Sequence, residues 1–214
     1  MQFSDSRYEE MMLYVKRLLN NGKSRKAERS HNPIRNRAEH TERVVRWALK
    51  LSEGYTRLDK EVVLIAAIFH DVGYCFSENK EIDHGKQSAK LCAEYLRKKK
   101  YAKDRIDEIC SIIRKHSQKG LLSEPGSSKE LIVLMEADLL DETGALGILK
   151  DCAYESANNM SNYVKVNLYI KNHSGRIIGS NPMVTKRGKK YWLEKQKVMT
   201  AFIHDIETSL GTNN

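Results

Sequence analysis

Apolar residues recur at steps of three and four along most of the chain, which is the spacing of one face of an α-helix. Turns or polar segments, such as the Pro/Gly-containing stretch 120–128, separate these patterned runs. The pattern predicts helices over 6–20, 37–52, 60–70, 86–99, 106–116, 129–141, 145–163 and 185–210. We therefore expect an all-α fold, a bundle of roughly seven to eight helices.

One segment departs from this pattern. Val164, Val166, Leu168 and Ile170 alternate with polar or aromatic residues, and 171–175 supplies turn-forming residues. Such alternation is typical of a β-strand with one buried face. We interpret 164–178 as either a short β-hairpin or an irregular connector.

Histidine and aspartate side chains continue the apolar faces of four predicted helices. These residues are His40, His70, His116 and Asp138, and Asp71 follows His70 directly. Leaving such groups unpaired away from water costs several kcal/mol. A single inward histidine is commonly bonded to a backbone carbonyl, and an inward aspartate can cap a helix or pair with an arginine. Several converging imidazoles and carboxylates instead favour a divalent transition-metal site.

The ordered set His40, His70-Asp71 and Asp138 resembles the H…HD…D signature of the HD superfamily of metal-dependent phosphohydrolases. The resemblance covers roughly Ile34 to Leu146, and the strings FHDVGY and EADLLDETG look like those of small stand-alone bacterial HD proteins. It implies a single HD-type domain over 1–214, with an HD core at about 34–146. The helix at 6–20 and those within 145–210 would pack on this core.

Two further histidines extend the resemblance. His84 in DHGKQSA and His116 in IIRKHS resemble the expanded H…HD…H…H…D form, which holds two metals. The chain lacks the GYP extension of the cyclic-dinucleotide type. The expected ligand set is His40, His70, Asp71, His84, His116 and Asp138. Imidazole and carboxylate together suit one or two ions of Mn, Fe, Co, Ni or Zn better than Mg or Ca, which prefer all-oxygen shells.

The expected chemistry is attack of metal-bound hydroxide on phosphorus, with Asp71 bridging the ions as the central catalytic group. Lys86 and Lys115 are candidate catalytic residues through phosphate contact, and Arg37, one helical turn before His40, is a further candidate for phosphate binding. No serine or cysteine in the set is paired with a base, so covalent catalysis is not indicated.

These features predict a metal-dependent phosphohydrolase that cleaves a nucleotide or another small phosphate ester or anhydride. Two alternatives stay open: a phosphodiesterase acting on an oligonucleotide or cyclic dinucleotide, and a non-enzymatic binding protein stabilised by metal. The expected partner is a small phosphorylated substrate, a nucleotide before nucleic acid. A homodimer is left open, and no membrane partner is expected.

Composition is that of an ordinary soluble domain. The 214 residues carry a net charge of +9 and a 40% hydrophobic fraction, and no apolar run approaches the ~18 residues of a membrane span. The start of the chain does not resemble a signal peptide. Four cysteines without C-x-x-C spacing fit a reducing bacterial cytoplasm. The basic run 186–190 is either a solvated face or a contact for phosphate-rich ligands.

Overall fold

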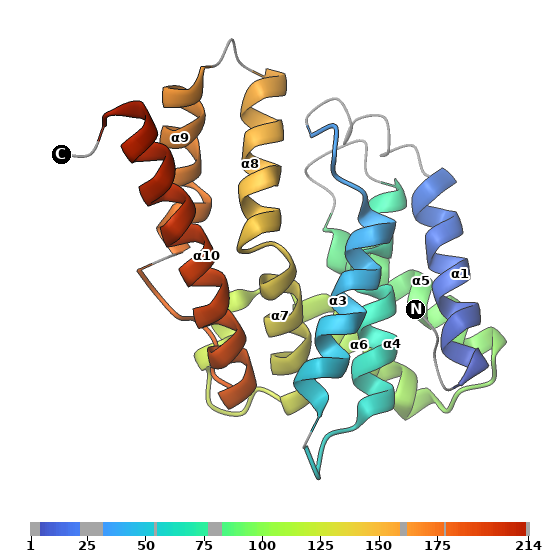
Figure 1. The fold of residues 1–214 in the computed structure, drawn as a ribbon. Helices are drawn as coiled ribbons and strands as arrows, with labels where there is room; N and C mark the ends of the chain where they lie inside the picture. The colour runs from blue at the N-terminus through green and yellow to red at the C-terminus, as the bar shows by residue number, and fades with distance from the viewer. Residues whose placement is uncertain are drawn as a thin grey trace. The chain divides into compact units, whose positions relative to one another are not determined.

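The structure is a computed structural model that describes residues 5–21, 32–53, 55–76, 83–158, 162–177 and 179–212. The described residues form nine α-helices and three short 3₁₀ helices, without a strand (Figure 1). The all-α prediction is therefore confirmed. In chain order the elements are α1 (Ser6–Asn21), α3 (Arg37–Ser52), α4 (Lys60–Phe69), η1 (Val72–Phe76), α5 (His84–Lys98), α6 (Lys103–Lys115), η2 (Lys119–Ser123), α7 (Lys129–Asp141), α8 (Ala145–Asn158), α9 (Tyr163–Asn172), η3 (Ser174–Ile177) and α10 (Lys186–Leu210).

The chain divides into two compact units. The first unit comprises Met1–Ala27 and Asn36–Asp138, and the second comprises Glu28–Arg35 and Leu139–Asn214. The sequence predicts a single domain over 1–214, and the division into two units does not test that prediction.

Helix α4 forms the centre of the first unit. Its residues from Val62 to Phe69 are all buried, and it packs against α1, α3, α5 and α6. Arg105 of α6 fastens the start of the helix, because its guanidinium donates to both carboxylate oxygens of Asp59, the N-cap residue. His70 and Asp71, which follow Phe69, are buried as well, so the helix ends in the core.

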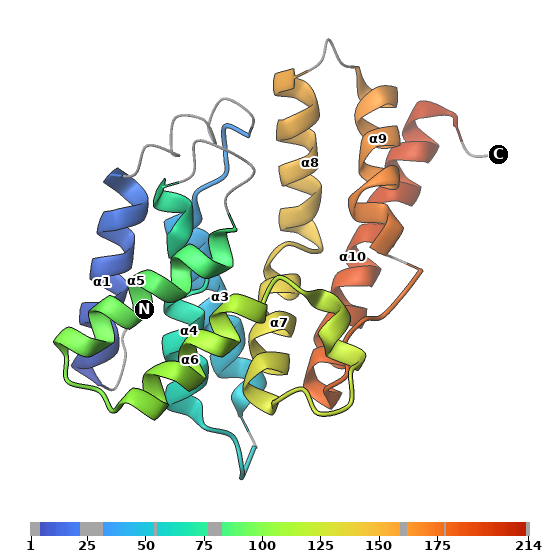
Figure 2. The same cartoon turned by 180° about the vertical axis from the view of Figure 1, so that it is seen from behind.

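The second unit contains three long helices. Helices α8, α9 and α10 run side by side in both views (Figures 1 and 2) and contact one another. Ile148, Ile170 and Met199, one from each helix, form a buried cluster between them.

Both interpretations of 164–178, a hairpin and an irregular connector, are wrong, because the described part of this segment belongs to the helix α9 and the short η3 that follows it. Val166 and Ile170 face the buried cluster, whereas Val164 and Leu168 are exposed. Each pair is spaced i, i+4, so two pairs on different faces of one helix produced the alternation that resembled a strand. The preceding helix is shorter than predicted and ends at Asn158.

No helix among the described residues combines the length and the apolar character needed to cross a membrane.

Candidate metal centre

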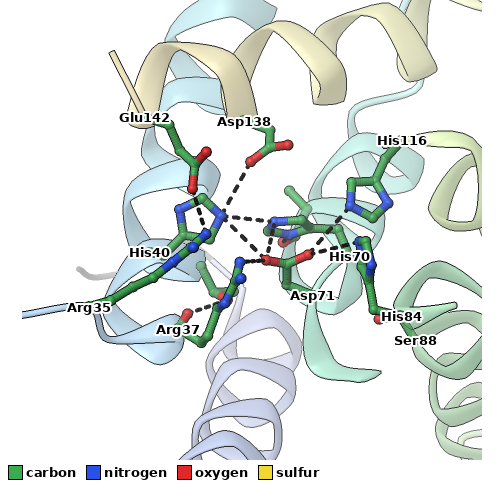
Figure 3. Close-up of polar contacts among 12 residues, drawn as sticks. Arg35, Arg37, His40, His70, Asp71, His84, Ser88, His116, Asp138 and Glu142 are labelled. Atoms are coloured by element: carbon green, nitrogen blue, oxygen red, sulfur yellow. Dashed lines mark hydrogen bonds and ion pairs between the residues drawn. The ribbon is translucent and has the colours of Figure 1, made fainter. Parts of the chain in front are cut away.

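All six ligands predicted from the sequence converge in the first unit (Figure 3). Each comes from a different position of the helical scaffold. His40 lies on α3 and Asp138 on α7, His70 and His116 are the C-cap residues of α4 and α6, Asp71 follows His70, and His84 is the first residue of α5.

Helix ends set the orientation of two of the histidines. The last carbonyls of an α-helix have no partner within the helix. Nδ1 of His70 donates to the Ala67 carbonyl at 2.8 Å, and Nδ1 of His116 donates to the Ile113 carbonyl at 2.6 Å. A carbonyl only accepts, so Nδ1 carries a proton in both rings, and Nε2 is the nitrogen that faces the cluster. Metal-binding histidines commonly donate their other ring nitrogen in this way, which fixes the orientation of the ring.

His40, His70 and Asp138 form the first ligand group. Nε2 of His40 lies 3.3 Å from Nε2 of His70 and 3.3 Å from Oδ1 of Asp138. Oδ2 of Asp71 lies 3.6 Å from Nε2 of His40 and 3.7 Å from Nε2 of His70. Metal bonds of about 2.1 Å separate two neighbouring ligand atoms by roughly 3 to 3.5 Å. The four separations, from 3.3 to 3.7 Å, lie within or slightly above this range, close to the spacing of ligands around one ion.

His84 and His116 form the second ligand group, on the other side of the same carboxylate. Their Nε2 atoms lie 3.6 Å and 3.4 Å from Oδ1 of Asp71. The two oxygens of Asp71 thus face different histidine groups, which is the arrangement of a bridging carboxylate (Figure 3). Residues His70, Asp71 and His116 also offer ligand atoms within 4.8 Å of one another, as do the three members of the first ligand group.

The chemistry of these atoms fits a cation between them. The unprotonated Nε2 of His70 accepts but does not donate, and the same holds for an ionised Asp71 oxygen. Acceptors that face one another in a buried place repel unless a positive charge lies between them. The donor set thus fits a bound divalent metal, because imidazole and carboxylate together suit Mn, Fe, Co, Ni or Zn.

The protonation states agree with this role. Burial lowers the pKa of His70 from 6.5 to about 4. Burial raises the pKa of Asp71, but His70 and Arg37 outweigh it, and the net pKa is well below the ordinary value. For Asp138 the effect of burial is likewise outweighed, first by Lys119 and then by His40. At neutral pH the histidine is neutral and both carboxylates are ionised, which are the forms that bind metals.

Arg37 and Tyr74 complete the wall around Asp71 and His84. Nη1 of Arg37 donates to Oδ2 of Asp71 at 2.6 Å, and its guanidinium lies 3.8 Å from the centre of the Tyr74 ring. His84 also stacks on that ring, at 4.5 Å between ring centres with an interplanar angle of 17°. Arg37, a predicted phosphate contact, is therefore beside the cluster, whereas the sequence reasoning missed Tyr74.

Gly73 allows the second ligand group to approach Asp71. A Cβ at this position would lie 2.4 Å from the His84 carbonyl oxygen and 2.7 Å from the Ser88 amide nitrogen. The Gly73 amide donates to Ser88 Oγ at 2.8 Å. Only glycine permits η1 to pack this closely against the start of α5, and this contact places His84 next to the HD pair.

Two predicted lysines are not brought into the cluster. Lys86 is 74% exposed, and its Nζ pairs with Asp83 at 3.4 Å. Lys115 is exposed and lines a groove of about 830 Å³ formed by α6, η2 and the start of α7. The lysine that reaches a ligand is Lys119, whose Nζ lies 2.6 Å from Oδ2 of Asp138. It follows the end of α6, so helical spacing from His116 gave no signal for it.

Comparisons with known proteins agree with this geometry. A family model described as HD domain matches residues 37–143, half of the chain. A comparison with curated proteins found no match.

Three solved structures illustrate the similarity of fold. An HD-superfamily hydrolase from Bacillus thuringiensis has a TM-score of 0.72 at 19% identity, covering 97% of this chain and 98% of its own. YpgQ from Bacillus subtilis, in complex with ADP, has a TM-score of 0.68 at 21% identity, covering 95% of each chain. The Lin1889 protein from Listeria innocua has a TM-score of 0.65 at 22% identity, covering 97% of this chain and 99% of its own.

At sequence identities of 19–22% these structures show similarity of fold alone. The family model independently covers the segment that contains the six candidate ligands. The chain belongs to the HD-domain family, whose fold supports metal-dependent phosphohydrolase chemistry in general.

Proposed function

We propose that this protein is a phosphohydrolase that uses two divalent metal ions to cleave a phosphate ester or anhydride bond of a nucleotide. The observation that carries the proposal is the position of Asp71. Its Oδ2 faces His40 and His70, and its Oδ1 faces His84 and His116, at 3.4–3.7 Å. One carboxylate shared between two sets of nitrogen ligands is suited to holding two ions close together.

Each ligand group would hold one of the two ions. The first ligand group and Oδ2 of Asp71 would hold one ion, and the second ligand group and Oδ1 would hold the other. Two ions held by these residues would lower the pKa of bound water towards neutrality and would stabilise the charge that develops on the phosphoryl group. Asp71 fixes the separation of the two sites, and the carbonyls of Ala67 and Ile113 fix the rings of His70 and His116.

Arg37 supplies a cation beside the reacting group. Its guanidinium is held on one side by Asp71 and over its plane by Tyr74. A guanidinium presents several N–H donors in a fixed plane, a geometry that suits recognition of phosphate oxygens. We therefore assign phosphate contact to Arg37 before Lys86 and Lys115, whose side chains are exposed away from the ligands.

A nucleotide is the proposed substrate class for two reasons. The structurally similar YpgQ was solved in complex with ADP. A small anionic ligand also matches a site that offers a guanidinium and candidate ligands for divalent cations, whereas an extended nucleic acid requires a longer run of basic groups.

The test is a substrate panel with added Mn²⁺: p-nitrophenyl phosphate, bis-p-nitrophenyl phosphate, nucleotides, dinucleoside polyphosphates, cyclic dinucleotides and short oligonucleotides. We expect turnover that chelator abolishes and a preference for nucleotides or dinucleoside polyphosphates. Preference for oligonucleotides, with a rate that collapses as salt rises, would favour the phosphodiesterase alternative. Metal binding without turnover of any compound would contradict an enzymatic role.

A further inference from the structure

Lys119 makes a contact within the candidate metal centre that lies outside the six ligands. Its Nζ lies 2.6 Å from Oδ2 of Asp138 and 3.5 Å from the Met135 carbonyl, both on α7. The carboxylate is only 18% exposed and the lysine side chain 28% exposed. A pair at this depth is screened less by water than one on the surface.

The backbone that carries Lys119 is anchored. The amide of Gln118 donates to the Lys115 carbonyl at 2.9 Å, and the amide of Leu121 donates to the Gln118 carbonyl at 2.9 Å. Leu122 is buried, and Ser127 Oγ donates to the Leu121 carbonyl at 2.7 Å. The ammonium is thus presented to Asp138 by a hydrogen-bonded turn, so the contact is a built feature of the fold.

The two oxygens of Asp138 have different partners. Oδ1 lies 3.3 Å from Nε2 of His40, whereas Oδ2 is the oxygen that Lys119 approaches. Asp71 differs, because both of its oxygens face histidine nitrogens. A carboxylate coordinates an ion in bidentate fashion only when both oxygens can turn towards it.

We infer that Lys119 is a positioning residue that holds Asp138 to a single metal-facing oxygen and so keeps a position on the first ion open for water or substrate. The inference rests on the proposed metal-dependent function. It gives Lys119 a role distinct from phosphate contact, because the lysine acts through a ligand. An open position is what distinguishes a catalytic metal site from a closed structural one.

The test compares Lys119→Met with the wild-type protein at less than one Mn²⁺ per chain, without substrate. Bound Mn²⁺ speeds the relaxation of water protons in proportion to the number of exchanging waters that it carries. Beside four protein ligands an octahedral ion keeps roughly two other ligands. If the second oxygen of Asp138 takes one of these places, relaxation enhancement per bound ion falls about two-fold, with Mn²⁺ still bound.

Two variants control for other effects. Lys115→Met removes a lysine from the same groove without touching a ligand, and should keep the wild-type enhancement. Lys119→Arg restores a cation, and should recover most of it. We also expect kcat of Lys119→Met to fall roughly 10- to 100-fold with little change in KM, as when other residues that hydrogen-bond to metal ligands are replaced. Lys119→Ala carries the same expectations should the methionine variant fail to fold.

Wild-type relaxation enhancement in Lys119→Met would overturn the inference and leave the proposed function standing. A rise in KM alone, with kcat and enhancement unchanged, would also overturn it, because it would assign Lys119 to substrate contact. If the wild-type protein itself showed no enhancement with Mn²⁺, the proposed metal site would fail, and the inference with it.

Discussion

The two ligand groups on either side of Asp71 are built differently. His40 lies on α3 and His70 directly follows α4. These two helices pack against each other in the core of the first unit, and both side chains are almost inaccessible. His84 is the first residue of α5 and is 21% exposed, with the Tyr74 ring stacked on it. Core packing therefore orients the first ligand group, whereas local contacts at a helix start orient part of the second.

This difference has a consequence for metal affinity. The first ligand group and Asp71 offer four donor atoms, and the second group and Asp71 offer three. Ligands that are already fixed lose less conformational freedom when they bind. We therefore expect tight binding of one ion on the first side and weaker binding of another on the second.

Removing Asp71 should have the largest effect, because it is the only ligand that faces both groups. In Asp71→Ala we expect turnover to fall by several orders of magnitude, and added Mn²⁺ to raise the thermal midpoint far less than in the wild-type protein. The measurements are phosphatase rate and thermal unfolding on the same samples.

Val63→Ala is the control for Asp71→Ala. Val63 is buried in α4, so its truncation should cost about 1–3 kcal/mol of stability while metal binding and turnover persist in the folded protein. An Asp71→Ala protein with wild-type turnover would rule out the bridging role.

Replacing one histidine on each side should separate the two sites. We expect His40→Ala to weaken the tighter Mn²⁺ binding step by about 100-fold, the upper range for a perturbed metal shell. His84→Ala should spare that step and weaken only the second. Calorimetric titration with Mn²⁺ resolves the two steps, and equal effects of the two substitutions would mean that the sides are not distinct.

The pH dependence of the metal-free protein probes the buried side. Burial lowers the pKa of His70 from 6.5 to about 4. Between these values the unfolded chain binds a proton that the folded chain does not, so the free energy of unfolding falls as pH decreases from about 6.5 to about 4. The full shift corresponds to on the order of 3 kcal/mol.

Denaturant unfolding in chelator between pH 7 and pH 4 measures this loss, and His70→Gln should show a flatter dependence over the same window. The lowered pKa values of Asp71 and Asp138 add a loss that begins at about pH 5 in both proteins, so the difference between the two proteins above that pH reports His70. Identical pH dependence of the two proteins would show that His70 titrates normally in the folded state.

The smallest effect is expected at Tyr74, which supports the second side through its ring. Tyr74→Leu should weaken the second Mn²⁺ step about 10-fold and leave the first unchanged. Tyr74→Phe keeps the ring that stacks on His84, and should behave like the wild-type protein. A phenylalanine variant as weak as the leucine variant would show that stacking is not the cause.

Much of the candidate site could be predicted because helical periodicity carries direction. Residues three or four apart on a helix share a face, so the stripes that identified the core also pointed His40, His116 and Asp138 inward. The same rule explains Arg37, which lies three residues before His40 and reaches Asp71.

Helical periodicity also explains why two predictions failed and why two site residues were missed. Successive helical residues are about 100° apart, so Lys115 beside His116 and Lys86 two residues after His84 point away from the ligands. Tyr74 and Lys119 lie on the 3₁₀ turns η1 and η2, beyond the helices whose period could be read. Their positions depend on tertiary contacts, such as the close packing at Gly73.

The number of metal ions per chain tests the central claim most directly. Elemental analysis of Mn²⁺-saturated protein after removal of unbound metal should give two ions for the wild-type chain. The double variant His84→Ala with His116→Ala should retain one, because the first ligand group and Asp71 remain. A wild-type protein that never exceeds one ion, with the same value in the double variant, would contradict the two-sided site.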